Sequence, residues 1–229
     1  MSKKNSTKHY NNKHTSLDEE KERLIKQLKK QGYICSAQVE HALRAVPREF
    51  FVPEHLKHAA YVDSPLSIGK GQTISAPHMV AIMCEALDVH PGHVVLEIGT
   101  GLGYHAAVMS YLVGPTGKVF SVERIPELAT QATTILEKLE IPNVCVVLDD
   151  GSQGLSKYQP YDRIYVTCAS PKVPPPLMDQ LQDLGKLLIP VGDMMCSLEL
   201  WEKNQGKMFH KDLGGCAFVP LLGRFGHQK

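Results

Sequence analysis

The sequence lacks an apolar run that could cross a membrane. A spanning helix needs roughly 18 or more consecutive apolar residues, and no stretch of the 229 residues approaches that length. The N-terminal stretch "MSKKNSTKHYNNKHTS" is basic, but no apolar segment follows it, so it does not resemble a secretory signal. We therefore expect residues 1–16 to form a flexible polar tail on a cytoplasmic protein that does not bind membranes.

Paired cysteines and an excess of one charge are also missing. The six cysteines are widely spaced and form no CxxC pair, which argues against a zinc site and a disulfide framework and suits a reducing cytoplasm. The formal net charge of +1 gives no reason to expect a nucleic-acid partner. What is present, 43% apolar and 21% charged residues, is typical of a globular protein. A chain of this length suffices for one α/β domain with a sizeable core.

Two amphipathic helices are predicted near the N-terminus. Ser16 is a good N-cap for the first, and Ser36 begins the second, which Pro47 should end. The apolar stripe of the first helix consists of Leu24, Ile25 and Leu28. Residues 61–77, "YVDSPLSIGKGQTISAP", contain two prolines and two glycines and predict a loop ahead of an apolar helical run.

From residue 93 onward the pattern alternates between strands and helices. Short apolar runs predict buried parallel strands at residues 93–99, 118–123, 144–148, 162–167 and 186–191. Helices are expected between them at residues 104–113, 126–139 and 176–184. The last segments, residues 197–213 and 216–222, alternate and turn at Asn204 to Gly206, as antiparallel edge strands do.

This order predicts an α/β fold: a doubly wound, Rossmann-like, mostly parallel seven-stranded sheet with antiparallel edge strands and a helical N-terminal cap. We expect a single domain over residues 17–229. Residues 17–80 would form the helical cap and a substrate loop, and residues 81–229 the cofactor-binding sheet. The residues alone leave the order of the last two strands open.

Three glycines, Gly99, Gly101 and Gly103, follow a buried strand directly and open a helix. Glycines here let the backbone turn sharply and let a ligand approach the chain closely. The signal is weak alone, because glycine turns that serve only packing are common. Tyr104 stands where the dinucleotide fingerprint would have its last glycine or alanine, so pyrophosphate binding is disfavoured.

Acidic residues lie at or beside the ends of three successive predicted strands. They are Glu97 on the first, Glu123 on the second, and Asp149 and Asp150 on the third. In a parallel sheet these ends share one edge, where ligands bind. A carboxylate after the second strand suits ribose hydroxyls, and one near the third can receive an adenine amino group. Several carboxylates around a cofactor that has no phosphates suggest that the cofactor is cationic. Each acid taken singly could instead be a solvated strand end.

The stretch "VLEIGTGLGY" resembles the first motif of the class I methyltransferases, which bind S-adenosyl-L-methionine. The resemblance implies that Glu97 and the loop Gly99, Thr100, Gly101 and Gly103 lie along the methionine part of this cofactor. It also implies that Glu123 binds the ribose and that Asp150 and Gly151 flank the adenine.

The methyl acceptor must be inferred from other positions. Amino-methyltransferases of nucleic-acid bases resemble an NPPY-type motif after the fourth strand, but "VTCASPKVP" has no aromatic residue and no asparagine there. Metal-dependent catechol-type enzymes would need acidic ligands at this place, and Thr167 and Cys168 offer none. Both alternatives are therefore weakened.

The chain resembles the protein-L-isoaspartate O-methyltransferase family over about residues 20 to 225. The motifs, in the family's order, are "DSPLSIGKGQTISAPHMVAIM", "LEIGTGLGYHAAV", "VERIPELA", "DDGSQG", "PYDRIYVT", "PVG" and "FVPLLG". The implied activity is methylation of the α-carboxyl group of L-isoaspartyl residues in damaged proteins, with D-aspartyl residues as a further acceptor. The ester then closes to a succinimide, which reopens partly to normal aspartate. The sequence departs from the family at Leu102, His105, Asp149 and Cys168, where serine, glutamine, glycine and alanine are common.

A carboxylate acceptor needs no general base, because an ordinary carboxyl pKa is about 4. The enzyme then only has to orient the carboxylate toward the methyl group and to exclude water from the site. The catalytic role falls to Ser75, whose hydroxyl could hold one carboxylate oxygen while the other attacks, as the resemblance also implies. Thr73, Ile74 and His78 would line the cofactor or close the loop over it. Alternatively, Ser75 is an ordinary helix N-cap and His78 a packing histidine.

Three functions are thus compared. The leading one is repair methylation of isoaspartyl proteins by a monomer that needs no metal. The second is a methyltransferase of the same fold that acts on a small molecule or RNA. The third is a non-enzymatic binding module, which would have no need of Gly99, Gly101, Gly103, Glu123 and Ser75 together.

Overall fold

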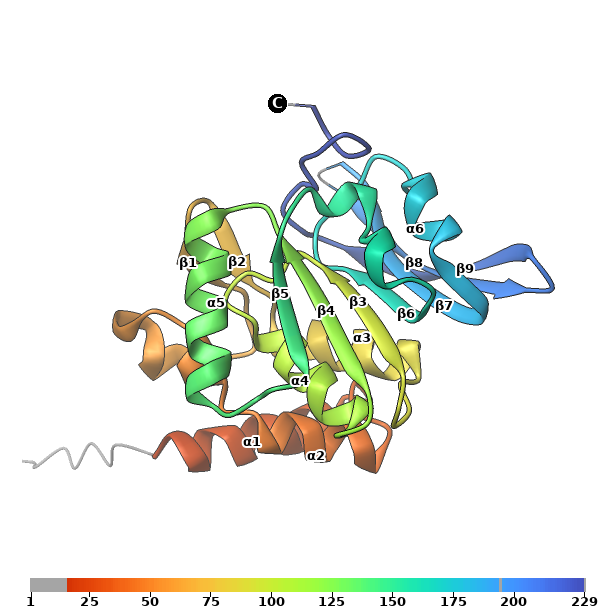
Figure 1. Cartoon of the computed structure of the whole chain (residues 1–229). Helices are drawn as coiled ribbons and strands as arrows, with labels where there is room; N and C mark the ends of the chain where they lie inside the picture. The colour runs from red at the N-terminus through yellow and green to blue at the C-terminus, as the bar shows by residue number, and fades with distance from the viewer. Residues whose placement is uncertain (1–15, 194, 229) are drawn as a thin grey trace, which may run out of the picture.

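A seven-stranded sheet forms the centre of the computed structural model, which describes residues 16–193 and 195–228 (Figure 1). Residues 1–15 of the predicted tail lie outside the described residues. The strands of this sheet are β3 (Val94–Ile98), β4 (Lys118–Glu123), β5 (Val144–Leu148), β6 (Tyr161–Val166), β7 (Leu181–Gly192), β8 (Cys196–Asn204) and β9 (Lys207–Cys216). Their order is β5-β4-β3-β6-β7-β8-β9. Strands β3 to β7 pair in parallel, and β8 and β9 add antiparallel pairs at one edge, which confirms the predicted fold class.

Helices pack against both faces of the sheet. They are α1 (Leu17–Lys30), α2 (Ala37–Ala45), α3 (Pro77–Leu87), α4 (Tyr104–Val113), α5 (Pro126–Lys138) and α6 (Pro175–Asp179), with short 3₁₀ turns at Arg48–Phe51, Glu54–Ala59, Gly151–Gln153 and Ser156–Tyr158. Successive side chains of a strand point to opposite faces, and Val95 and Leu96 of β3 accordingly belong to two different clusters of buried apolar residues. The first cluster reaches from Leu24 on α1 to Leu198 on β8, so the N-terminal helices share a core with the sheet.

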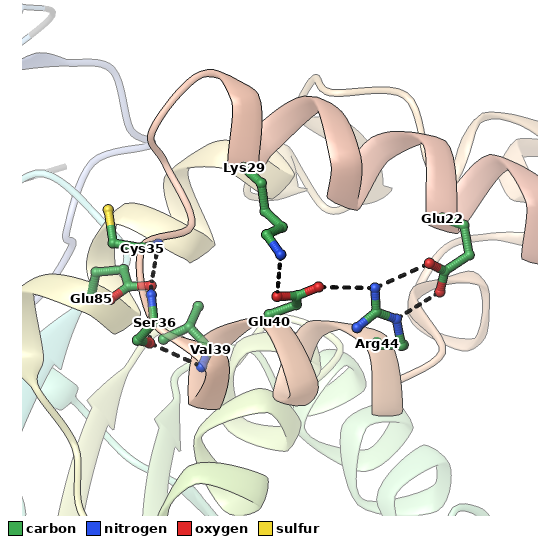
Figure 2. A network of polar contacts seen from close by, with 8 residues as sticks. All are labelled: Glu22, Lys29, Cys35, Ser36, Val39, Glu40, Arg44 and Glu85. Carbon is green, nitrogen blue, oxygen red and sulfur yellow. Dashed lines mark hydrogen bonds and ion pairs between the residues drawn. The ribbon is translucent and has the colours of Figure 1, made fainter.

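Helices α1 and α2 form the predicted N-terminal cap and lie together at the bottom of Figure 1. Their caps are those expected: Ser16 Oγ accepts from Glu19 N, and Ser36 Oγ from Val39 N. Charged side chains join the two helices, as Figure 2 shows. Lys29–Glu40 and Arg44–Glu22, both at 2.7 Å, connect the helices, and Arg44–Glu40 at 3.1 Å links the two pairs within α2.

The cap also fixes helix α3. Glu85, on α3, accepts hydrogen bonds of 2.8 Å from the backbone N–H groups of Cys35 and Ser36 just before α2 (Figure 2). Two backbone donors at the start of one helix are thereby satisfied by a side chain of another. Because α3 begins at Pro77, this contact helps to position the segment that contains Ser75.

Residues 61–77 are not a plain loop, as the sequence had suggested. They contain a small antiparallel hairpin made of β1 (Leu66–Gly69) and β2 (Gln72–Ile74). The strands are too short to show an alternating pattern, and the turn between them, at Lys70 and Gly71, has positive φ angles of 54° and 70°. Glycine adopts such angles readily, so the residue that predicted a loop makes a tight hairpin turn.

Two further predictions at the C-terminal end were wrong in part. The expected helix 176–184 ends at Asp179, because Leu181 pairs with Tyr161 and already belongs to β7. The turn at Asn204 to Gly206 is confirmed, but residues 217–222 form no strand. Instead Ala169 exchanges backbone hydrogen bonds with Val219 and Leu221, so this segment crosses the sheet edge. None of the helices in residues 16–193 and 195–228 is long and apolar enough to span a bilayer.

Candidate active site

The glycine loop after β3 fits closely against the neighbouring strand β6. Gly99 has a φ of 97°, a conformation that side-chain-bearing residues rarely adopt. A Cβ atom there would collide with Thr167 Oγ1, which donates a 2.7 Å hydrogen bond to the carbonyl oxygen of Gly99. Gly151, after β5, is equally confined, since a Cβ would lie 2.5 Å from Ile98 Cγ2. Both positions therefore have to be glycine for these loops to pack against Thr167 and Ile98 at this edge of the sheet.

Glu123 ties the end of β4 to the glycine loop. Its carboxylate is buried, with Oε2 accepting from Gly101 N at 2.9 Å and Oε1 from Arg124 N and Ile125 N at 2.9 and 3.0 Å. A carboxylate has about four acceptor positions. Three are used by the backbone, so the group is held rigidly and can still accept from a ligand hydroxyl.

Glu97 is more deeply buried than Glu123 and less well satisfied. Its Oε2 accepts from the hydroxyl of Ser121, which lies 2.5 Å from Thr100 Oγ1. Its Oε1 has no hydrogen-bond partner among the described residues. Burial, reinforced by the negative charge of Glu123, raises the pKa of Glu97 to about 8. A cationic group placed beside Oε1 would give this atom a hydrogen-bond partner and would favour the ionised form of Glu97.

Three cavities meet at this edge of the sheet. The edge cavity is lined by Gly99, Gly101, Glu123 and Gly151. The deep cavity is lined by Glu97, Thr100 and His105, and the outer cavity by His78, Met79 and Phe218. Thr73 and Thr167 line all three, whereas Ser75 lines the deep and the outer cavity.

Most of the predicted site residues come together around these cavities. They are Thr73, Ile74, Ser75, Glu97, Gly99, Thr100, Gly101, Glu123 and Gly151. Ser75 does not cap α3, because the N-cap is Ala76 and no side chain bonds to the free amides there. The alternative role for this serine therefore has no support in the geometry.

Of the other predicted cofactor residues, Gly103 and Asp150 do not line these cavities, and His78 lines only the outer one. Gly103 is the N-cap of α4, where a Cβ would contact Leu136 instead of a cavity. The carboxylate of Asp150 accepts from Ser152 and, at 2.8 Å, from Arg224 N, so it fastens the C-terminal segment. His78 faces the outer cavity, and its Nδ1 lies 2.9 Å from Asp63 Oδ1.

The edge cavity is also lined by residues without a predicted role in binding: Thr167, Cys168 and residues 219–222. Thr167 could have been found, because it ends a predicted strand whose carboxyl end faces the same edge. Residues 219–222 could not, since their place depends on backbone bonds to Ala169.

Comparison with known proteins agrees with this geometry. Residues 19–226 match the family described as protein-L-isoaspartate(D-aspartate) O-methyltransferase. A protein-L-isoaspartate O-methyltransferase from Methanocella arvoryzae is 59% identical over 183 residues, covering 80% of this chain and 97% of the relative. Protein-L-isoaspartate O-methyltransferase 2 from Archaeoglobus fulgidus is 53% identical over 212 residues, covering 92% and 96%.

Solved structures show the same likeness. A protein-L-isoaspartate O-methyltransferase superposes with a TM-score of 0.84 at 32% identity, covering 90% of this chain and 67% of the other. A Plasmodium falciparum structure described as the same enzyme, in complex with S-adenosyl-L-homocysteine, gives a TM-score of 0.79 at 27% identity and covers 87% and 97%. By its match over residues 19–226 and by these identities, the chain belongs to the protein-L-isoaspartate(D-aspartate) O-methyltransferase family.

Proposed function

We propose that this chain transfers a methyl group from S-adenosyl-L-methionine to the α-carboxyl group of L-isoaspartyl residues in damaged proteins, with D-aspartyl residues as a further acceptor. The family is named for this activity. The observation that carries the proposal is the place of Ser75, which lines both the deep cavity beside Glu97 and the outer cavity. A hydroxyl at such a boundary is suited to hold an acceptor that enters from outside.

The residues present fit the cofactor. Gly99 and Gly151 line the edge cavity without a side chain, where a Cβ would displace Thr167 or Ile98, and Glu97 offers an unpartnered buried oxygen to a cationic group. Glu123 would accept from the ribose hydroxyls, the deep cavity would hold the amino-acid end, and Gly151 would face the adenine. When bound, S-adenosyl-L-methionine supplies a methyl group on a sulfonium, which makes it an electrophile.

The chain's own residues orient the acceptor and exclude water. A carboxylate is already ionised at neutral pH, so no side chain has to remove a proton. Ser75 would donate its hydroxyl hydrogen to one carboxylate oxygen and leave the other free to attack. Val219 and Leu221 border the edge cavity with apolar surface. Because nucleophile and sulfonium lose charge together, a drier site favours the transition state.

Methyl transfer from labelled cofactor tests the proposal directly. An isoaspartyl peptide and its normal aspartyl twin are compared, and the label is then challenged with mild base, which releases carboxyl methyl esters. Base-labile label on the isoaspartyl peptide alone is the expected result. Label on neither peptide, with cofactor binding intact, would overturn the proposed function.

We further propose that residues 17–229 act as one methyltransferase domain, since buried residues of α1 and β8 belong to one cluster. A cytoplasmic monomer without nucleic-acid or membrane partners agrees with the net charge of +1. Because the acceptor needs no base, turnover should also need no added metal. Light scattering after size exclusion tests the monomer, and assays with a chelator, with and without magnesium, test the metal.

A further inference from the structure

Two polar atoms of residues that line the deep cavity, Glu97 Oε1 and His105 Nδ1, are buried without a hydrogen-bond partner among the described residues. The buried hydroxyl of Tyr165 lies close enough to interact with the Glu97 carboxylate. Glu97 and Tyr165 are fully buried, and His105 is 6% exposed. Orphaned buried atoms are uncommon in folded proteins. Glu97, His105 and Tyr165 lie on β3, α4 and β6. The two orphaned atoms, Glu97 Oε1 and His105 Nδ1, at one cavity indicate a ligand with complementary polar groups.

The surroundings of His105 determine which of its nitrogens carries the proton. Burial lowers the pKa of His105 to about 3, so the ring is neutral at physiological pH. Nε2 lies 3.6 Å from Cys84 Sγ, and burial raises the pKa of this thiol, which therefore stays protonated. An imidazole nitrogen is a better acceptor than a thiol sulfur. Cys84 thus donates to Nε2, and the ring proton resides on Nδ1, the orphaned atom.

The aromatic ring of Tyr165 holds the imidazole in place. The two ring centroids are 4.5 Å apart, tilted by 46°. The imidazole Nε2 is held by Cys84 of α3. A neutral, oriented N–H donor therefore lies on the same cavity as an unpartnered carboxylate oxygen.

We propose that His105 binds the carboxylate of the cofactor's amino-acid end through Nδ1–H, while Glu97 Oε1 receives the ammonium group. The proposal rests on the cofactor of the proposed function, but not on the identity of the methyl acceptor. A neutral donor suits this place, because burial disfavours a charged imidazolium there. The glutamine that is common in the family at this position is likewise a neutral N–H donor.

Calorimetry with two ligands that differ only in the carboxylate of the amino-acid end tests the assignment. His105→Leu should weaken S-adenosyl-L-homocysteine about tenfold, the usual effect of losing one hydrogen bond to a charged group. It should leave the affinity for the decarboxylated analogue of that ligand unchanged. His105→Gln, which keeps a neutral donor, should stay within about threefold of the wild type for both ligands. An equal loss for both ligands, or no loss for either, would overturn the proposal.

Thermal unfolding without ligand separates binding from packing. His105→Leu removes an unsatisfied buried polar atom, so the ligand-free variant should unfold at the same or a higher temperature than wild type. The rise in unfolding temperature on adding S-adenosyl-L-homocysteine should shrink. A ligand-free protein that is destabilised, with the ligand-induced rise preserved, would assign His105 to packing.

A measurement on the wild type covers the case in which His105→Leu does not fold. When the histidines are labelled with ¹⁵N, the imidazole signal that is missing from His105→Gln should be that of an Nδ1–H tautomer. Its Nδ1 resonance should move on adding S-adenosyl-L-homocysteine and not on adding 5′-methylthioadenosine, which lacks the amino-acid end. A Nε2–H tautomer, or the same shift with both ligands, would refute the assignment. A failed isoaspartyl assay would leave all these binding results standing.

Discussion

The cofactor side and the acceptor side of the site are built in different ways. The cofactor side, meaning the edge and deep cavities, is shaped by the glycine loop and by the ends of β3 and β4, with Glu123 held by three backbone N–H groups. The acceptor side, meaning the outer cavity, combines residues 75–79 with residues 215–219, two segments far apart in the sequence. Changes to the first should therefore act on cofactor affinity, and changes to the second on turnover.

The largest effect is expected from Gly99→Ala. The added methyl group collides with Thr167 Oγ1, and alanine is strained at a φ of 97°. Calorimetry should show that the affinity for S-adenosyl-L-homocysteine falls by about a hundredfold or more, as a cost of several kcal/mol implies. Circular dichroism should confirm that the variant is folded.

Gly215→Ala is the matched control on the acceptor side. A Cβ there would have nothing within 4 Å, and the residue lines the outer cavity. Cofactor affinity should equal that of the wild type. If both variants bound the cofactor equally well, the division between the two sides would be wrong.

Ser75→Ala should have the next largest effect. Loss of one hydrogen bond to a charged group corresponds to roughly a thirtyfold fall in kcat on an isoaspartyl peptide. Ser75 donates no cap to α3, so the helix should keep its stability. Unchanged turnover would remove Ser75 from the mechanism, and a large loss of cofactor affinity would move it to the cofactor side.

Glu123→Gln should weaken cofactor binding about tenfold, because an amide keeps the size of the side chain but loses acceptor positions. Turnover at saturating cofactor should change much less. A Kd equal to that of the wild type would contradict the ribose assignment.

The cofactor side was predictable from sequence where consecutive residues form it, but not where residues 219–222 border the edge cavity. The apolar run "VVLEI", Gly99 and Gly101 suffice to place a buried strand and a tight turn. Helix α4 has its predicted limits, since Gly103 and Gly114 flank it. Glu123 was found because the ends of parallel strands share one edge.

The acceptor side was predicted only where a motif contained it. Ser75 was found, but the segment from residue 217 to 222 was assigned to a strand, because its alternation gives no sign of its bonds to Ala169. The place of Asp150 beside the adenine stays a prediction, and the hydrogen bond that its carboxylate accepts from Arg224 N was not foreseen. Such pairings depend on how distant parts of the chain meet, which local pattern does not encode.

The response of stability to pH should single out Glu97. Its pKa of about 8 lies above the unfolded value of 4.5, so between these values the folded protein keeps a proton that the unfolded chain has lost. The stability from this group is complete below the unfolded pKa and is lost as the pH rises through the folded pKa. Between these two pKa values, Glu97 alone should lower the free energy of unfolding by about 1.4 kcal/mol for each unit by which the pH rises.

Urea unfolding of the ligand-free wild type and of Glu97→Gln measures this slope. The difference between the two proteins should shrink or reverse steadily between about pH 5.5 and 7.5, because glutamine does not titrate. Ser75→Ala serves as the acceptor-side control and should run parallel to the wild type. A constant difference between wild type and Glu97→Gln would show that Glu97 is ionised throughout.

The smallest effect is expected outside both sides, in the α1–α2 cap. Arg44→Ala breaks the pairs with Glu22 and Glu40, but the arginine side chain is 36% exposed, so the pairs are partly screened by solvent. Urea unfolding should show a loss of about 0.5–1 kcal/mol that diminishes with added salt. Lys57→Ala, which breaks an exposed pair with Glu54, should have a still smaller effect.

Since neither Arg44 nor Lys57 lines the edge, deep or outer cavity, cofactor affinity and turnover should stay at wild-type values. A fall in turnover on Arg44→Ala would mean that the cap acts on Ser75 through α3, and that the acceptor side extends beyond the outer cavity.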